Sequence, residues 1–509
     1  MSTWAPGSVR EACAAARMAL LALACLLCAC AVGPDFKRPQ APAATHYAPG
    51  SDPVQTVAAQ GAAQRMSSAE KVVPDWWRLF RSPALDAVVA EALAGNPGIE
   101  AAQASLRQSE DTLRSGYGIF FPDIAVGAAA SRQRVAPEKI GVKAPATIFN
   151  LFTLSASASY ALDLFGGERR MVEALHAQVD VQRATEQATY LTLIANIVNT
   201  VIASAAYRAE IEATQQLIEL QRQQVKLTEV QWHAGIVPYA NALLLQTQLA
   251  SNEATVAQYQ QRLAQSEDLL ATLTGHVPAE WQSADVRLSD LTLPQDLPVS
   301  LPSELVRQRP DILAAESTAH AASANVGVAT AAMLPSITLS GTYSANGTGT
   351  GTVFSSAGRA WDVGANLTAP LFEGGTLWFR RKAAIDSYQQ AMALYRQVVL
   401  GAFGQVADTL RALENDAVAL RAQDAALSSA KEALHLVQIN YQAGLSTYLE
   451  VLIADEQYHQ AITNDLQATA VRYQDTVALY VALGGGWWSQ GDTVPPGSYS
   501  RAWQQPLGQ

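Results

Sequence analysis

The sequence has 509 residues and a formal net charge of −11, and a usual domain size of about 150 residues predicts about three domains. Hydrophobic residues make up 49% of the chain and charged residues only 16%, below the usual ~25%. The acidic balance and the lack of a basic patch argue against nucleic acid as a partner. No run of 18 apolar residues occurs, which argues against a helical membrane protein. The four cysteines all lie within the first 30 residues, so the rest of the chain has no disulfide framework or cysteine-ligated zinc.

The N-terminus has the organisation of a lipoprotein signal peptide. Arg10 and Arg17 precede the apolar run 18–29, which is too short to span a bilayer. The run ends in Leu-Cys-Ala-Cys, which is similar to a bacterial lipobox. We therefore expect cleavage before Cys30, with acyl chains on that cysteine as the membrane anchor. Ordinary signal cleavage beside an incidental cysteine is the alternative.

Four landmarks recur in the same order about 210 residues apart, which indicates an internal duplication. They are Pro97 with Pro310, Pro122 with Pro335, LFGG at 164–167 with LFEGG at 371–375, and Ala234-Gly235 with Ala443-Gly444. Each half carries helices and a pair of strands. The predicted segments are a signal peptide at 1–29, a lipidated extended tether at 30–75, repeats at 76–300 and 301–485, and a C-terminal segment at 486–509.

Period-two alternation predicts four strands, at about 123–134, 151–165, 336–346 and 361–371. Each has one apolar face and one face of small polar residues, as in transmembrane barrels. A soluble sandwich shows the same alternation, but uniformly Ser/Thr-rich faces would give it a poor core. Four strands cannot close a barrel, and an open sheet in lipid would leave unpaired backbone groups. A membrane barrel must therefore be shared between chains, and three copies would supply twelve strands around a polar lumen.

Two segments predict unusually long helices. The first runs from Gly167 to about Gln231 with no Pro or Gly after Gly167, which corresponds to about 100 Å of helix. The second covers 376–443 and carries an apolar stripe of Leu394, Val398, Ala402, Val406, Leu410, Leu413, Ala417 and Leu420. Such helices cannot fold inside one compact domain, so we expect them to pack side by side and against copies of themselves. A cytoskeletal coiled coil is the alternative, against which the signal peptide and strands argue.

The sequence contains no motif for catalysis. The seven histidines are scattered, without metal-ligand spacing, and neither a phosphate-binding loop nor a GxSxG nucleophile elbow occurs. We therefore predict that the protein is not an enzyme and holds no cofactor or metal, apart from the lipid on Cys30.

A tight helical hairpin is predicted where the second long helix stops at Gly444, since glycine is a helix C-cap signal. In a three-fold assembly this turn would approach the pore axis. Glu450 would then form a ring of carboxylates and Leu449 a ring of apolar side chains, which suit a gate and cation filter. The alternative is that Glu450 is a solvated helix residue and Leu449 packs within the coil.

The sequence resembles the outer membrane factors, the TolC-like efflux channels, and in particular their NodT-type lipoproteins. The matching segments are LCAC-AVGPDFKRP after the signal, WWRLFRSPALDAVVAEALAGNP at 76–97, LDLFGG at 162–167, RPDILAAESTAHAASANVGVATAAMLPSITLSG at 309–341, APLFEGG at 369–375 and ALGGGW at 482–487. They cover nearly the whole mature chain.

The resemblance implies an α+β membrane fold: a homotrimer with a 12-stranded β-barrel in the outer membrane of a Gram-negative bacterium and a 12-helix periplasmic barrel. An equatorial region would come from about 275–305 and 484–509. A periplasmic adaptor protein and an inner-membrane transporter, often proton-driven, are the implied partners. Tyr441 aligns with a constriction tyrosine, Leu449 with a gating leucine and Glu450 with a gating acid. Ile453 stands where relatives often carry a second Asp, and Asp455 faces elsewhere on the helix.

We therefore predict a passive outer-membrane exit duct for drugs or other small molecules. One alternative uses the same fold as the exit channel of a protein secretion system. The other is a periplasmic coiled-coil lipoprotein without a pore.

Overall fold

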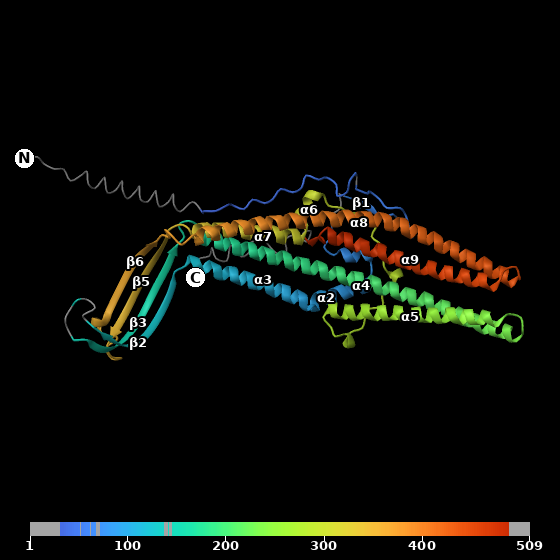
Figure 1. Ribbon diagram of the computed structural model, residues 1–509, viewed down its shortest axis with the longest axis horizontal. Helices are drawn as coiled ribbons and strands as arrows, with labels where there is room; N and C mark the ends of the chain where they lie inside the picture. The colour runs from blue at the N-terminus through green and yellow to red at the C-terminus, as the bar shows by residue number, and fades with distance from the viewer. Residues whose placement is uncertain are drawn as a thin grey trace, which may run out of the picture. The chain divides into compact units, whose positions relative to one another are not determined.

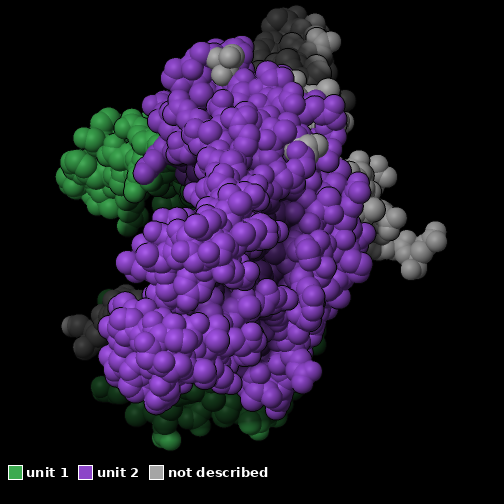
Figure 2. Space-filling view, turned by 90° about the vertical axis from the view of Figure 1, so that its right-hand side faces the viewer, with its two compact units in different colours: residues 1–39, 106–182, 315–395 green, residues 40–105, 183–314, 396–509 purple. Residues whose placement is uncertain are grey.

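The computed structural model describes residues 31–50, 52–61, 63–67, 72–136, 141 and 145–487. The predicted signal peptide, Cys30 and all but the first two residues of the predicted C-terminal segment lie outside this described part. The chain divides into two compact units, coloured in Figure 2. Unit 1 comprises residues 1–39, 106–182 and 315–395, and unit 2 comprises residues 40–105, 183–314 and 396–509.

Long helices and two small groups of strands make up the described chain (Figure 1). The α-helices are α2 (Pro83–Gly95), α3 (Pro97–Gly116), α4 (Gly167–His233), α5 (Tyr239–Thr274), α6 (Pro302–Gln308), α7 (Pro310–Ala331), α8 (Thr376–Gln442) and α9 (Tyr448–Ala482). The strands are β1 (Arg65–Ser67), β2 (Asp123–Val135), β3 (Thr147–Leu162), β4 (Asp296–Pro298), β5 (Ser336–Gly347) and β6 (Arg359–Thr368). Short 3-10 helices lie at Trp76–Phe80, Tyr117–Phe120, Pro278–Glu280, Leu288–Asp290 and Ser356–Gly358.

Unit 1 contains a four-stranded antiparallel sheet in the order β2-β3-β5-β6, which lie side by side in Figure 1. β3 begins at Thr147, four residues before the sequence-based estimate, and ends at Leu162. β6 begins at Arg359 and ends at Thr368, so Leu371 lies beyond the strand. β2 and β6 are the two edge strands, and within the described chain neither pairs with a further strand on its outer side.

The sheet has one apolar and one polar face. The registers of all three pairs run without a bulge, so register partners share a face throughout. The apolar face includes Ile124, Val126, Phe152, Leu154, Tyr160, Ile337, Leu339, Tyr343, Trp361, Val363 and Leu367, and the polar face includes Ser155, Ser157, Ser159, Thr338, Ser340, Thr342, Ser344 and Asn366. Several side chains on the apolar face are largely exposed. Val126 and Trp361 are each 76% exposed. Among the described residues, the apolar face is therefore not covered by a core.

The two longest helices, α4 and α8, have 67 residues each. Each ends at a turn whose glycine has a positive φ, +70° at Gly235 and +76° at Gly444, a conformation that favours glycine. An 18-residue window of α4 is apolar enough to cross a membrane by length and composition alone, and 56% of that window is buried in the structure. A buried core helix passes the same test, so this window does not by itself indicate a membrane span.

The apolar stripe of α8 is buried from Ala402 onward, where every predicted member is at most 2% exposed. Before this point the stripe lies one residue away from its predicted position. Tyr395 and Val399 are buried there, whereas Leu394 is 50% exposed. The buried residues Ala391, Tyr395, Val399 and Ala402 are three or four residues apart and share one face, and the predicted positions Leu394 and Val398 lie beside that face.

The predicted N-terminal tether is extended, but it is packed onto the rest of the chain. In unit 2, β1 pairs in parallel with β4. Gln64 donates a hydrogen bond to the Pro294 carbonyl oxygen, and the Arg472 guanidinium donates to Gln64 Oε1 at 3.2 Å and to the Ala59 carbonyl oxygen at 2.8 Å. Both Gln64 and Arg472 are at most 1% exposed. A Pro/Ala/Gly-rich composition predicts extension correctly but does not indicate where the segment binds.

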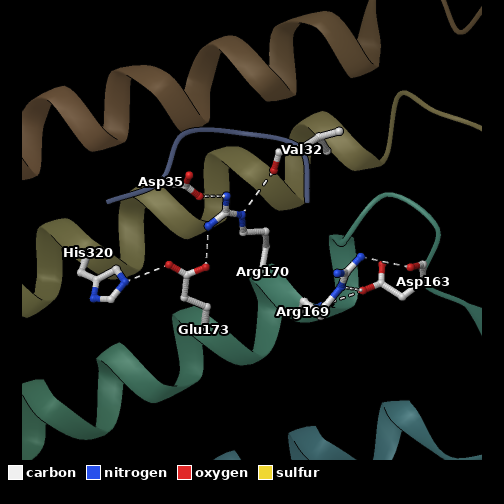
Figure 3. Close-up of polar contacts among 7 residues, drawn as sticks. All are labelled: Val32, Asp35, Asp163, Arg169, Arg170, Glu173 and His320. Carbon is white, nitrogen blue, oxygen red and sulfur yellow. Dashed lines mark hydrogen bonds and ion pairs between the residues drawn. The ribbon is translucent and has the colours of Figure 1, made fainter. Parts of the chain in front are cut away.

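In unit 1, residues 32–38 lie against the start of α4 and against α7 (Figure 3). The Val32 N–H donates to the Phe165 carbonyl oxygen, and Arg170 donates to both the Val32 carbonyl and Asp35. Arg170 also pairs with Glu173 at 2.7 Å, and the His320 ring nitrogen lies 2.9 Å from Glu173 Oε1. This segment is called the docked arm below.

Candidate functional site

The turn between α8 and α9 holds the predicted gate residues, and local hydrogen bonds define its shape. The Leu445 N–H donates to the Asn440 carbonyl oxygen at 2.8 Å, across the turn that Gly444 makes. Thr447 then caps α9: its side-chain oxygen accepts from the Glu450 N–H at 3.4 Å. The end of one helix and the start of the next are therefore fixed within a few residues.

Glu450 has a specific local partner. Its Oε2 accepts from the Thr447 N–H at 3.0 Å, which completes a capping box with Thr447. The residue remains exposed. Its carboxylate is therefore oriented at the helix N-terminus, where negative charge is stabilised, and is still open to solvent.

Tyr441 and Leu449 also lie at this turn. Tyr441 packs edge-on against Tyr448, with ring centroids 5.5 Å apart. The Tyr448 hydroxyl donates to Gln224 Oε1 of α4 at 3.3 Å, which links the α9 start to α4. Leu449 is 58% exposed, so it does not pack in the coil of this chain. The three predicted residues are thus brought to one turn, with Tyr441 in ring contact and Leu449 and Glu450 facing solvent.

Ile453 and Asp455 differ sharply in their surroundings. Ile453 is 50% exposed, whereas Asp455 is 5% exposed. Asp455 Oδ2 accepts from Gln221 Nε2 at 3.3 Å, and Gln221 Oε1 in turn accepts from Asn252 Nδ2 at 3.0 Å. Burial raises the pKa of Asp455 from its usual value to about 6. Asp455 is therefore part of a buried polar chain from α9 through α4 to α5.

The sequence does not by itself mark the turn between α4 and α5 as a site. Trp232 packs on Tyr239 across this turn, with ring centroids 4.3 Å apart. Ile236 is 70% exposed there, and Leu445 at the α8–α9 turn is 80% exposed. The sequence signal for this second exposed turn is Ala234-Gly235, which repeats the Ala443-Gly444 of the α8–α9 turn.

No group of three or more His, Cys, Asp or Glu residues that could hold a metal ion occurs among the described residues. The arrangement offers an exposed turn with an oriented acid and apolar side chains, together with a sheet of two chemically different faces.

Comparison with known proteins identifies the family. The family described as "Outer membrane efflux protein" matches residues 88–276 and 301–485. The chain belongs to this family. Its members are channels of the outer membrane that serve tripartite efflux systems, and the two long matches cover both halves of the chain.

Two relatives illustrate the similarity in sequence. The chain is 30% identical over 425 residues to "Pyoverdine export outer membrane protein OpmQ" of Pseudomonas aeruginosa, which covers 82% of this chain and 88% of the relative. It is 28% identical over 486 residues to "Probable efflux pump outer membrane protein TtgC" of Pseudomonas putida, and this match covers 93% of this chain and 96% of the relative.

Solved structures of outer-membrane channels are similar to this chain in fold. The outer-membrane channel OprN has a TM-score of 0.81 and 28% identity, and the match covers 90% of this chain and 100% of OprN. The open-state MtrE channel of Neisseria gonorrhoeae has a TM-score of 0.77 and 26% identity, and the match covers 90% of this chain and 98% of MtrE. The chain therefore has the helix-rich fold of the outer-membrane efflux channels.

Proposed function

We propose that three copies of this chain form a passive exit duct in the outer membrane of a Gram-negative bacterium. The observation that carries this proposal is the four-stranded sheet, which has an exposed apolar face, a polar face and two open edges. An open edge in lipid leaves backbone groups without partners, so the sheet requires further strands. Pairing β6 of one copy with β2 of the next supplies them. Three copies close a 12-stranded barrel, within the known size range of such barrels.

The two matches to one family, at 88–276 and 301–485, support the tandem duplication. Equivalent series of elements follow each other in the chain: α3, β2, β3, α4 and α5, then α7, β5, β6, α8 and α9. In this proposal each repeat contributes two strands and one long helical hairpin, so three chains supply twelve strands.

The α8–α9 turn is the proposed periplasmic gate. Leu449 and Glu450 are exposed in the single chain and sit beside Tyr441 at one turn, which suits side chains that meet copies of themselves at a pore axis. At the position where relatives often carry a second gate acid, this chain has Ile453, which has no carboxylate. Asp455 is the next acid along the helix, but it is buried and does not face the gate. We therefore propose one acidic ring, made by Glu450.

The proposed anchor is a covalent lipid on Cys30, two residues before the docked arm in the sequence. The proposed partners are a periplasmic adaptor and an inner-membrane transporter, which supplies energy that the duct itself lacks. We propose that the duct has no catalytic activity of its own, because the family it belongs to consists of efflux channels.

Small molecules are the proposed cargo. Relatives are named for the export of pyoverdine, for toluene efflux and for cation efflux. The compounds in those names differ in chemistry. This agrees with a duct that is lined by Ser, Thr and other small side chains and that selects weakly among compounds. The inner-membrane transporter then sets the specificity.

Disulfide cross-linking across the barrel tests the trimer directly. Chains carrying Gly364→Cys on β6 together with Ala125→Cys, Gly127→Cys or Ala129→Cys on β2 place both cysteines on the polar face. At least one pair should give a covalent trimer on a non-reducing gel, because neighbouring strands bring Cα atoms within disulfide range.

The matched control is Gly364→Cys with Ser157→Cys, since β3 already has partners on both sides. This control should give no covalent oligomer. Monomers with every β2 pair, in protein extracted from the outer membrane, would contradict the trimeric barrel.

A further inference from the structure

The charged residues of the four-stranded sheet are divided by sign between its two faces. The strands contain five charged residues: Asp123, Arg132, Arg134, Arg359 and Asp362. The registers place all three arginines on the apolar face and both aspartates on the polar face. A charge on the apolar face of a membrane sheet is costly at the middle of the bilayer and tolerated near the interfaces. The position of the arginines along the strands therefore matters.

All three arginines lie at the end of the sheet away from the helices. The chain enters β2 at Asp123 from α3 and leaves β3 at Leu162 toward α4, so the helices join the opposite end. On both edge strands, arginine is the next same-face residue after the last apolar side chain. Arg132 follows Ala130 on β2, and Arg359 precedes Trp361 on β6.

The neighbouring strand β3 marks the same boundary. Arg132 pairs in register with Asn150, and Ala130 pairs with Phe152. From Phe152 to Leu162 the same face carries only apolar residues and Tyr160. These ten steps correspond to about 34 Å along the strand, or about 26 Å of height at the usual tilt of about 40°. That height matches the apolar band of an outer-membrane barrel, about 25 Å, so Arg132 lies at its outer rim.

The three guanidinium groups are available to a ligand. All three residues are exposed, and none has an ion pair with another residue in the part of the chain that the structure describes. Arg132 and Arg134 are two residues apart on one face, about 7 Å along the strand. The arginine guanidinium binds phosphate in a bidentate manner, and its stem can lie along apolar surface.

We propose that Arg132, Arg134 and Arg359 bind the phosphate groups of a phosphorylated lipid headgroup in the outer leaflet. The proposal rests on the proposed function, because it requires the sheet to span the membrane with its helices on the periplasmic side. A lipid is favoured over free phosphate because the arginines continue an apolar face that acyl chains would cover. In a closed barrel β6 of one copy adjoins β2 of the next, so each junction would combine arginines from two copies.

Native mass spectrometry of the full-length trimer tests this assignment, with bisphosphorylated lipid A and its dephosphorylated form as probes. The wild-type protein should prefer the bisphosphorylated lipid. The triple variant Arg132→Gln, Arg134→Gln, Arg359→Gln should bind it at least about tenfold more weakly, because each arginine near an anionic surface contributes to binding. The triple Lys variant keeps the charge and loses the bidentate contacts, so it should bind more weakly than the wild type and more tightly than the triple Gln variant. The exposed α3 substitution Arg107→Gln should leave the binding unchanged.

Three results would overturn the assignment: equal binding of the two lipids, equal binding by the triple Gln variant, or displacement of the lipid by an equimolar amount of inorganic phosphate. Bilayer conductance of the same preparations separates the two proposals. A wild-type trimer that conducts but shows no lipid preference contradicts only the arginine site, whereas a wild-type protein that neither trimerises nor conducts contradicts the duct itself.

Discussion

At the scale of single residues, Glu450 makes a local contact in addition to the gate role proposed for it. Its carboxylate closes the capping box with Thr447, and the side chain is still exposed. A substitution such as Glu450→Ser removes the charge and the cap together. Separating the roles requires one variant for each.

Glu450→Gln removes the charge, and its amide oxygen can still accept from the Thr447 N–H. We expect this variant to lower the cation-to-anion permeability ratio of the trimer, measured as the reversal potential in a KCl gradient. Thr447→Ala is the control: it weakens the cap by about 1 kcal/mol and keeps the charge, so the ratio should not change. An unchanged ratio in Glu450→Gln would remove this residue from the filter.

Asp455 is a buried carboxyl. Its position two residues after Ile453 predicts only that it faces another side of the helix. The structure shows that this side is the contact with α4, where Gln221 donates to it. Burial raises its pKa from 3.8 to about 6. The ionised form therefore costs stability above pH 6, and the cost diminishes as the pH falls toward 3.8.

Asp455→Asn should therefore stabilise the protein, with a dependence on pH. The gain in free energy of unfolding should be at most about 3 kcal/mol at pH 7.5 and about half of that at pH 5. Thermal unfolding of the detergent-solubilised protein at both pH values measures it. The exposed α5 substitution Asp268→Asn should show no comparable gain. A loss of stability that is equal at both pH values would contradict the role assigned to burial.

At the scale of elements, the docked arm depends on a close approach of two backbones. A Cβ on Gly33 would overlap the Gly327 Cα of α7, and a Cβ on Gly327 would lie 2.7 Å from Arg170 Cγ. Gly33 also has a φ of +98°. The arm therefore reaches the Arg170 cluster in Figure 3 only because both positions lack side chains.

Gly33→Ala should release the arm. Gly50→Ala is a closely matched control, because Gly50 has a φ of +96° and open space around its Cβ position. Both variants carry the backbone strain, and only Gly33→Ala adds the overlap, which costs about 1–3 kcal/mol. Limited proteolysis within residues 32–38 should be faster in Gly33→Ala than in Gly50→Ala. Equal rates would show that the arm is not held by this contact.

Much of the secondary structure could be predicted from local signals. The absence of Pro and Gly over 168–231 predicts α4, and Gly444 predicts the end of the second long helix close to where α8 stops. Alternation predicts the two faces of the sheet. The docked arm could not be predicted, because its contacts join residues far apart in the sequence, such as Asp35 with Arg170. The burial of Asp455 depends in the same way on Gln221 of α4.

At the scale of the whole molecule, the central claim is that a single chain is incomplete. The sheet exposes its apolar face and both edges, and the turn at Glu450 exposes Leu449. In the proposed trimer, copies of the chain around one axis would cover each of these features. The polar face then becomes the lumen, and the only charges that the described strands bring to it are Asp123 and Asp362.

Planar-bilayer conductance of the purified trimer tests this claim most directly. The duct predicts an ion conductance that needs no energy source and that prefers cations, because acids line the lumen and the gate. A stable trimer that inserts into the bilayer and gives no conductance would contradict the account.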